Sequence, residues 1–444
     1  MSAHSHRSRI ARLQLPAAAV HRMALAALAA LAALVGLGAC DAQAAPLTLD
    51  DALRFAQERS RQLPAQDAAA AAARDMALAA GQRPDPVLKT GLNSLPVSGP
   101  DRFSLVRDNF TMLSLGVSQE LTRSGKLKAR TSRFEREAEV AEASRELALA
   151  NLQRDTAMAW LDRHYQERMR EVLATQRDEA RLQIDAADAA YRGGRGSQAD
   201  VFAARSSVAQ IEDRIAQTER QIATATTQLT RWVGTAAAEP LGSPPTLDAV
   251  RMSAEDLETQ LAHHPQIAVM VRQEAMARAD AEVARANKQT DVSVELTYNQ
   301  RGPSYSNMVS VNLSVPLQWD QKNRQDREVA AKLSIVEQIR AEREEATRMH
   351  VADTLVMLQE WRSHRDRLTR YDASLLPLAA ERTRASMAAY RGGSGPLTAV
   401  LEARRGEIDT RIERLRLEME AARLWAQLNY LLPAGHDAPV AARP

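Results

Sequence analysis

Hydrophobic residues along this chain follow two periodicities, and the first is an alternation of apolar and polar positions. In its clearest example Leu113, Leu115 and Val117 fall on one face, with small polar residues between them. Period-two alternation over about ten residues predicts strands, either in a half-buried soluble sheet or in a membrane barrel. Such strands are expected at about 86–93, 111–121, 292–300 and 308–317.

The second periodicity is helical and extends over much longer segments. Apolar residues step by three and four, as at Met158, Leu161 and Tyr165, with arginine and glutamate between them. This pattern predicts coiled-coil-like packing with a solvated outer face. The first long segment could reach roughly 100 Å if it is continuous, whereas Pro377 interrupts the second. The expected long helices cover 124–190, 198–234, 320–389 and 396–432.

The two halves of the chain repeat one another. The segment Tyr191-Arg192-Gly193-Gly194 recurs as Tyr390-Arg391-Gly392-Gly393, 199 residues later. Upstream, Met112-Leu113-Ser114-Leu115 is echoed by Met308-Val309-Ser310-Val311 after 196 residues. Each half is expected to contain two helices, two strands, a very long helix, a glycine-rich turn and a returning helix. The layout is then a first repeat at 45–234, a linker at 235–252, a second repeat at 253–433 and a tail at 434–444.

Four strands are too few for a membrane barrel. Phe110 and Tyr298 lie near one end of the strands and Trp319 near the other, where aromatic girdles would sit. An open sheet edge in lipid leaves backbone groups without hydrogen bonds. If the strands are in lipid, several chains must therefore contribute to one barrel.

The N-terminus predicts a Sec-type signal peptide over residues 1–44. A basic region with four arginines precedes an apolar run at 23–39, and Ala42-Gln43-Ala44 offers a small-residue cleavage site. The only cysteine, Cys40, ends a Leu-Gly-Ala-Cys sequence that resembles a bacterial lipobox. Two outcomes stay open: Cys40 becomes the lipidated first residue, or cleavage after Ala44 removes it. In neither case does the exported body contain a disulfide.

Charge and motif content exclude several functions. Residues 1–44 hold four of the 58 basic and one of the 56 acidic residues, so the remainder has 54 basic and 55 acidic residues. Binding to nucleic acid therefore has no electrostatic support. The sequence contains no nucleophile motif, phosphate loop or dinucleotide fingerprint, and no cluster with metal-ligand spacing. We expect neither an enzyme nor a cofactor.

Taken with the duplicated plan, several short stretches make the chain resemble the TolC family of outer-membrane factors, over essentially all of residues 46–433. Within that family the chain is most similar to the heavy-metal-efflux CzcC branch. The stretches that carry this resemblance are Pro84-Asp85-Pro86-Val87-Leu88, Asn93-Ser94-Leu95-Pro96, Val117-Ser118-Gln119-Glu120-Leu121 and Gly125-Lys126.

The resemblance implies a mainly α protein with a small β-barrel contribution. Three chains would form a homotrimer in which twelve strands make one barrel in outer-membrane lipid, continued by a long periplasmic α-helical barrel. It implies a passive exit duct that a periplasmic adaptor opens and an inner-membrane RND pump drives, with heavy-metal cations as the preferred cargo. The alternatives are drug efflux or type I protein secretion through the same kind of duct, and a coiled-coil adaptor without a pore.

The resemblance also implies that the two glycine-rich turns are the periplasmic tips, where the adaptor docks. The expected docking residues are Tyr191, Gly193, Gly194, Gly196, Gly392, Gly393 and Gly395.

The same resemblance places the gate beside the tips. In the family an acidic residue after the first tip engages a tyrosine and an arginine of the second tip, and the matching positions here are Asp200, Tyr390 and Gly395. Because Gly395 replaces the arginine, Arg391 or Arg195 is expected to substitute for it. Of the two acidic constriction positions, Glu402 is retained and Ala399 replaces the other. One carboxylate per chain would still form a ring that favours cations.

Overall fold

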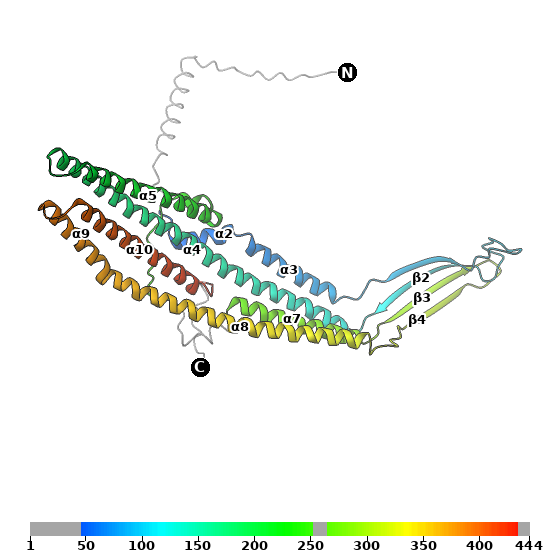
Figure 1. The fold of residues 1–444 in the computed structure, drawn as a ribbon. Helices are drawn as coiled ribbons and strands as arrows, with labels where there is room; N and C mark the ends of the chain where they lie inside the picture. Colours follow the sequence, from blue (N-terminus) through cyan, green and yellow to red (C-terminus); the bar gives the residue numbers. More distant parts are fainter. Residues whose placement is uncertain (1–45, 252–263, 434–444) are drawn as a thin grey trace, which may run out of the picture.

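The computed structural model describes residues 46–251 and 264–433. Over these residues a sheet lies at one end and two helical hairpins at the other (Figure 1). The expected signal peptide with Cys40, residues 253–263 of the second repeat and the tail at 434–444 lie outside the described residues.

From the helix before the strands onward, both repeats contain a helix, two strands, a long helical arm and a returning helix in the same order, which confirms the duplicated unit. The counterpart expected for the first helix of the first repeat lies outside the described residues. The first repeat consists of α2 (Leu49–Arg59), α3 (Gln62–Ala80), β1 (Val87–Asn93), β2 (Met112–Leu121), α4 (Ser124–Arg192), α5 (Gln198–Val233) and a 3-10 turn (Gly234–Ala238). The second consists of α7 (Pro265–Asn287), β3 (Val292–Arg301), β4 (Met308–Ser314), α8 (Gln325–Arg370), a π turn (Tyr371–Leu375), α9 (Leu376–Arg391) and α10 (Leu397–Asn429).

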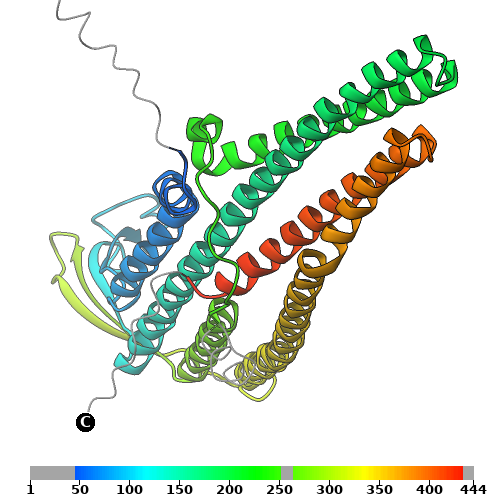
Figure 2. The ribbon, with the colours of Figure 1, turned by 90° about the vertical axis from the view of Figure 1, so that its left-hand side faces the viewer.

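The long helix predicted over 320–389 starts later than expected, and the interruption expected at Pro377 occurs just before that residue. The Asp320 carboxylate accepts a hydrogen bond from the Asn323 amide, and this turn delays the helix until residue 325. Further on, Pro377 has no N–H for the carbonyl four residues earlier, and the chain widens into the π turn just before it. Figure 2 shows the bend between α8 and α9 at this point.

The last strand is also shorter than predicted. The alternation extends to residue 317, but β4 ends at Ser314. Pro316 lies two residues further on and cannot donate to a neighbouring strand, which explains why regular pairing stops before it.

The sheet has one apolar and one polar face. Its strands run antiparallel in the order β1-β2-β3-β4, so that β1 and β4 form its two edges. Lys89, Glu295 and Asn299 lie on the polar face, where Lys89 pairs with Glu295 at 2.5 Å. The other face exposes a continuous layer of large apolar side chains to the surroundings of the chain: Leu88, Leu92, Leu113, Leu115, Val117, Leu121, Leu296, Tyr298, Val309, Val311 and Leu313.

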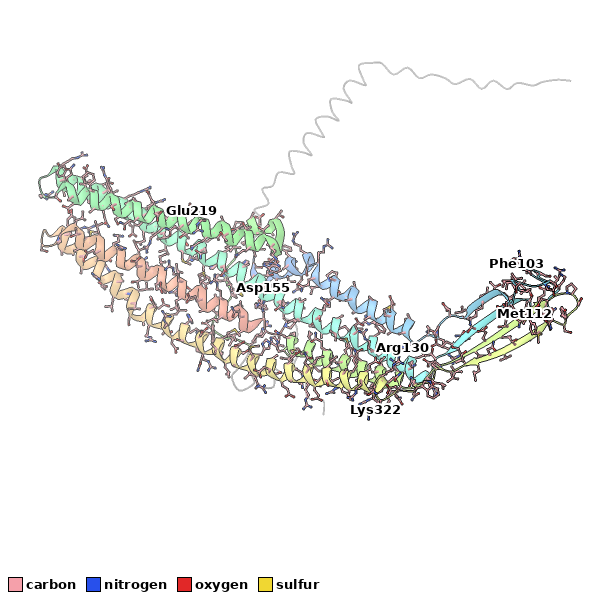
Figure 3. The ribbon with its side chains drawn as sticks, turned by 45° about the vertical axis from the view of Figure 1, so that its right-hand side comes forward. Phe103, Met112, Arg130, Asp155, Glu219 and Lys322 are labelled. Carbon is pink, nitrogen blue, oxygen red and sulfur yellow. The ribbon has the colours of Figure 1, made fainter. Side chains whose placement is uncertain are left out.

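The helices form two layers along the length of α4 and α8. Helices α3 and α5 pack on opposite halves of α4, while α7 lies between α4 and α8, and α10 contacts α4, α8 and α9 (Figures 1 and 2). Figure 3 places Lys322 where the sheet meets the helices, Asp155 midway along α4, and Glu219 on α5 in the upper hairpin. None of the helices in the described ranges combines the length and the apolar composition of a membrane span.

The main core lies at mid-length, around Trp160 of α4. Its ring is fully buried, and its Nε1–H donates to the Leu47 carbonyl oxygen at 3.0 Å. Leu161, Leu229 and Ala426 bring α4, α5 and α10 into the same cluster. This core therefore ties the start of the described chain to both hairpins.

Helix α7 begins at a buried histidine. The Nδ1 atom of His264 accepts a hydrogen bond from the Gln266 backbone N–H at 3.2 Å, which caps the helix N-terminus. Burial, the nearby ring of His350 and the charge of Arg154 lower the pKa of His264 to about 4. The imidazole is therefore neutral in the folded protein at neutral pH and can act as the cap acceptor.

Acid is expected to destabilise the protein through His264. The folded-state pKa lies below the unfolded value of 6.5, so the unfolded chain binds the proton first as the pH falls. Stability is retained above pH 6.5 and is lost between 6.5 and about 4, by on the order of 3 kcal/mol. Thermal unfolding at pH 7 and pH 4.5 measures this loss. The variant His264→Asn keeps a capping side chain without a titration and should show a smaller difference, whereas an unchanged difference would contradict the assignment.

Candidate functional site at the helical tips

Two turns with the same backbone geometry join the helices of each hairpin at the end far from the sheet. Gly194 has a φ of +66° and Gly393 a φ of +73°, the left-handed region that favours glycine. In the first turn the Arg195 N–H donates to the Ala190 carbonyl at 2.9 Å, and in the second the Ser394 N–H donates to the Ala389 carbonyl at 2.9 Å. Both turns therefore end a long helix by satisfying its last carbonyl groups.

The third glycine of each turn permits a close approach of the chain to the helix it leaves. A Cβ atom on Gly196 would lie 3.2 Å from the Ala190 Cβ, and one on Gly395 would lie 3.1 Å from the Ala389 Cβ. A larger residue at Gly395 must therefore push the turn away from α9. The resemblance places an arginine at the position of Gly395, and the close approach to α9 leaves little room for a side chain there.

The returning helices begin differently after the two turns. At the first, the Asp200 carboxylate accepts hydrogen bonds from the Ser197 N–H at 2.9 Å and from its hydroxyl at 2.7 Å. The Ser197 hydroxyl in turn accepts from the Asp200 N–H, which completes a capping box. The bond from the backbone, then that from the hydroxyl, lowers the pKa of Asp200. At the second turn Pro396 and Ala399 occupy the corresponding positions, and no side chain caps α10.

The gate residues expected from the sequence do not form one cluster in this structure. Asp200 is engaged by Ser197, and Tyr390 packs instead beside the apolar side chains that hold the two hairpins together. Arg391 and Glu402 are exposed. The apolar tip cluster comprises Ala187, Val201, Ala204, Leu397 and Val400.

A buried arginine joins the hairpins just beyond the tip cluster. The Arg404 side chain on α10 is only 14% exposed and pairs with Glu179 on α4. The Gln183 amide, with its oxygen turned toward the guanidinium, also accepts from Arg404 Nε at 2.6 Å. A second link between hairpins pairs Arg214 of α5 with Asp409 of α10 at 2.6 Å. Sequence reasoning missed Arg404, because Glu179 lies 225 residues away and no local pattern connects them.

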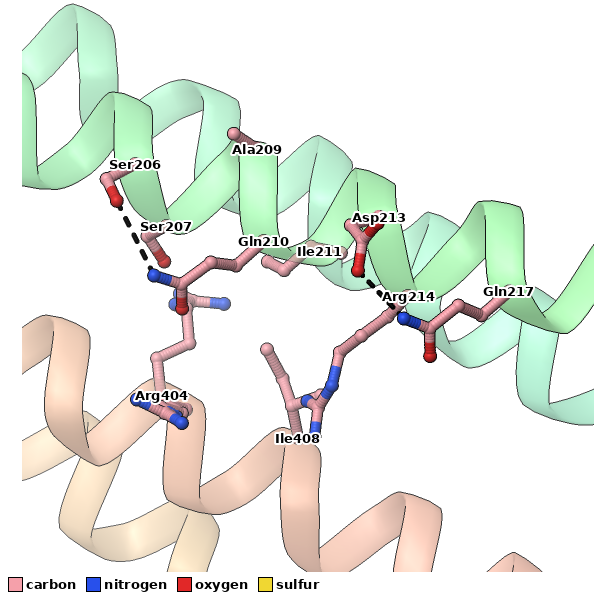
Figure 4. Close-up of a pocket in the computed structure, with 11 residues that line it drawn as sticks. Ser206, Ser207, Ala209, Gln210, Ile211, Asp213, Arg214, Gln217, Arg404 and Ile408 are labelled. Atoms are coloured by element: carbon pink, nitrogen blue, oxygen red, sulfur yellow. Dashed lines mark hydrogen bonds between the residues drawn. The ribbon is translucent and has the colours of Figure 1, made fainter.

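A groove runs between α5 and α10, beside the two ion pairs formed by Arg404 and Arg214 (Figure 4). It has a volume of about 550 Å³. Ser206, Gln210 and Gln217 line it from α5, and Arg404 and Ile408 line it from α10. Short polar side chains and two helical walls make a surface into which another helix can pack.

The described residues hold no group of three or more His, Cys, Asp or Glu side chains arranged to bind a metal ion.

Comparisons with known proteins match both the sequence of the first repeat and the fold. Residues 52–235 match the family model described as outer membrane efflux protein. The fold is similar to that of the outer-membrane channel OprN, with a TM-score of 0.72 and 16% identity over 87% of this chain and 90% of that chain.

Two further solved structures have a similar fold. CusC has a TM-score of 0.72 and 15% identity over 86% of this chain and 92% of its own. The outer membrane protein VceC from Vibrio cholerae has a TM-score of 0.72 and 17% identity over 86% of this chain and 95% of its own. No curated protein sequence matches the chain.

Proposed function

We propose that this chain is an outer-membrane efflux channel with a periplasmic helical extension rather than an enzyme, and that it is the exit duct of a tripartite pump for heavy-metal cations. Three copies assemble, a periplasmic adaptor docks at the tips, and an inner-membrane RND pump supplies the energy. The finer assignment to the CzcC branch belongs to this proposal and rests on the short sequence stretches that carry the resemblance.

The two-faced sheet is the observation that carries the proposal. Its apolar face is exposed over all four strands, as in Leu115 at 54% and Val311 at 71% exposed. A monomeric soluble protein rarely leaves such a layer uncovered, and lipid is the surrounding that suits it. The unpaired edges β1 and β4 then need partners, which further copies of the same sheet supply when they close a ring.

Adaptor docking is assigned to the two turns and to the groove between α5 and α10. Tyr191 of the first turn is 46% exposed, and so is available to a partner. The groove offers hydrogen-bonding side chains along its length, so a helical hairpin from the adaptor can lie between the two hairpins of the chain.

For the gate we retain Asp200, Tyr390, Arg391 and Glu402 as candidates and add Arg404. Arg404 is a positioning residue: its pair with Glu179 keeps the second hairpin against the first while the channel is closed. Glu179 is already 46% exposed, so parting of the hairpins returns mainly the Arg404 guanidinium to water. The pair therefore stabilises the closed state and is lost when the channel opens.

Removing the Arg404 side chain is expected to favour the open channel. The variant Arg404→Ala leaves Glu179 and Gln183 without their partner, and this affects the closed state only. If the closed state loses about 1.4 kcal/mol of stability relative to the open state, the ratio of open to closed channels rises about tenfold. Conductance of the purified channel in a planar bilayer measures this change. Arg405→Ala is the matched control, because Arg405 is 71% exposed and lies next in sequence. Equal conductance in the two variants would remove Arg404 from the gate.

The cargo is tested by growth of a deletion strain on graded zinc, cobalt, cadmium, copper and silver, beside antibiotics and detergents. Sensitivity confined to metals, restored by the wild-type gene, supports heavy-metal export. Sensitivity confined to drugs would leave the channel in place and overturn the cargo. Glu402→Ala in the same strain tests the cation-favouring ring and should reduce metal tolerance without changing tolerance to neutral drugs.

A further inference from the structure

A second cavity lies at mid-length, far from the tips and from the sheet. Its volume is about 650 Å³, and α4, α7, α8 and α10 all contribute to its walls. It is the place where α7 begins at His264 and α10 ends near Tyr430. Asp155, one of its lining residues, marks its position along α4 in Figure 3.

Corresponding faces of the two repeats line this cavity. Met158 on α4 and Met357 on α8 are separated by 199 residues, the same offset that separates the two tip turns. On each helix, three further lining residues lie three, four and seven positions before the methionine. Residues at these spacings share one face of a helix, so each helix turns one face toward the cavity. These faces are Asn151, Arg154, Asp155 and Met158 on α4, and His350, Asp353, Thr354 and Met357 on α8.

The cavity brings together two thioethers and two imidazoles. The rings of His264 and His350 lie with their centroids 4.8 Å apart, one from α7 and one from α8. The Nδ1 atom of His264 is occupied by the Gln266 N–H, so Nε2 is the nitrogen that remains for a ligand. Met158 and Met357 line the same cavity.

The charge of the cavity lining and its hydrogen bonding are both compatible with a bound cation. Arg154 and Asp155 form an ion pair at 2.8 Å, and their charges cancel. With both imidazoles neutral, Asp353 then gives the cavity lining a net charge of −1. The Thr354 side chain is 1% exposed, and its hydroxyl lacks a hydrogen-bond partner among the described residues. The hydroxyl is therefore available to water or to another occupant of the cavity.

We propose that this repeat-junction cavity binds one soft monovalent cation, Cu⁺ or Ag⁺, through the thioethers of Met158 and Met357 and the imidazoles of His264 and His350. Thioether ligands select soft cations, and imidazole is compatible with them. A harder divalent ion would need a cluster of nitrogen and carboxylate ligands, and no such group of three occurs in the described part of the chain. The site lies in the wall of the molecule, so it is independent of which cargo the duct carries.

Silver binding to the intact, detergent-solubilised protein tests the proposal. Equilibrium dialysis against Ag⁺ in chloride-free buffer, followed by elemental analysis, gives the number of ions per chain. The double variant Met158→Leu/Met357→Leu keeps the volume of both side chains and should lose one Ag⁺ per chain. Any silver held by Cys40 is common to both proteins and cancels in the difference.

Two further measurements separate this site from unspecific binding. His350→Gln should weaken Ag⁺ binding at least tenfold, and Ag⁺ should raise the thermal unfolding midpoint of the wild type but not of the double variant. The control Met169→Leu changes a methionine elsewhere on α4 and should bind as the wild type does. Unchanged stoichiometry and midpoint in the double variant would overturn the site. Displacement of Ag⁺ by an equal concentration of Zn²⁺ would overturn its preference for soft cations.

Discussion

Replacing Val311 by arginine is expected to remove the protein from the outer membrane as an assembled species. Val311 lies opposite Leu296 in the middle of β4, on the apolar face, and is 71% exposed in the single chain. An arginine facing lipid near the bilayer midplane costs about 2–4 kcal/mol, and each chain of an oligomer bears that cost. Membrane fractionation followed by electrophoresis of unheated samples measures the loss of assembled protein.

The neighbouring position provides the matched control. Asn312 lies next in sequence and opposite Glu295, so its side chain belongs to the polar face. Asn312→Arg introduces the same side chain on the same strand and should leave assembly intact, since it meets a carboxylate and water. If both arginine variants assemble equally well, the apolar face does not lie in lipid.

Truncating Trp160 should have the largest effect on stability. The ring is fully buried at the centre of the main core, and its Nε1–H has Leu47 as its partner. Trp160→Ala removes that bond and leaves a cavity, at a cost of about 3–5 kcal/mol. The thermal unfolding midpoint of the helical region is expected to fall by about 10 °C.

A smaller change at the same site distinguishes packing from a general defect. Trp160→Phe keeps most of the ring but loses the hydrogen bond to Leu47. It should cost less than the alanine variant, because an aromatic ring still fills most of the space. Circular dichroism during heating measures both variants. Equal midpoints for the alanine variant and the wild type would show that the core lies elsewhere.

Much of the architecture could be predicted because its signals are local or repeated. Alternation marks three of the four strands to within one residue at each end, and the fourth ends three residues early. The repeated turn Tyr-Arg-Gly-Gly marks both tips. The Ser197-x-x-Asp200 spacing is a capping-box signature that the sequence already contains. The prediction of a gating role for Asp200 did not take into account that its carboxylate is used by its own helix.

What the sequence could not provide are contacts between distant segments and small departures from regular geometry. Glu179 and Arg404 meet only because α4 and α10 pack together. Met158 and Met357 are recognisable as equivalent positions, but their common cavity depends on how the repeats pack. The π turn at Tyr371–Leu375 depends on a proline six residues after its start, and its type is a property of the folded helix. The exposed apolar sheet face and the family match over residues 52–235 favour a channel over the alternative of a pore-free adaptor.

If three sheets close into one ring, edge strand β1 of one chain lies beside edge strand β4 of the next, and crosslinking of these edges measures that closure. Gly91 lies on edge strand β1, and Ser310 and Asn312 lie on edge strand β4, all on the polar face. Chains with one cysteine at Gly91 and one at position 310 or 312 would be oxidised in outer-membrane preparations. A closed ring of three chains gives a covalent ladder that ends at three chains and that collapses to monomer on reduction. A product that remains monomeric for both pairs, or a ladder that continues beyond three chains, would contradict it.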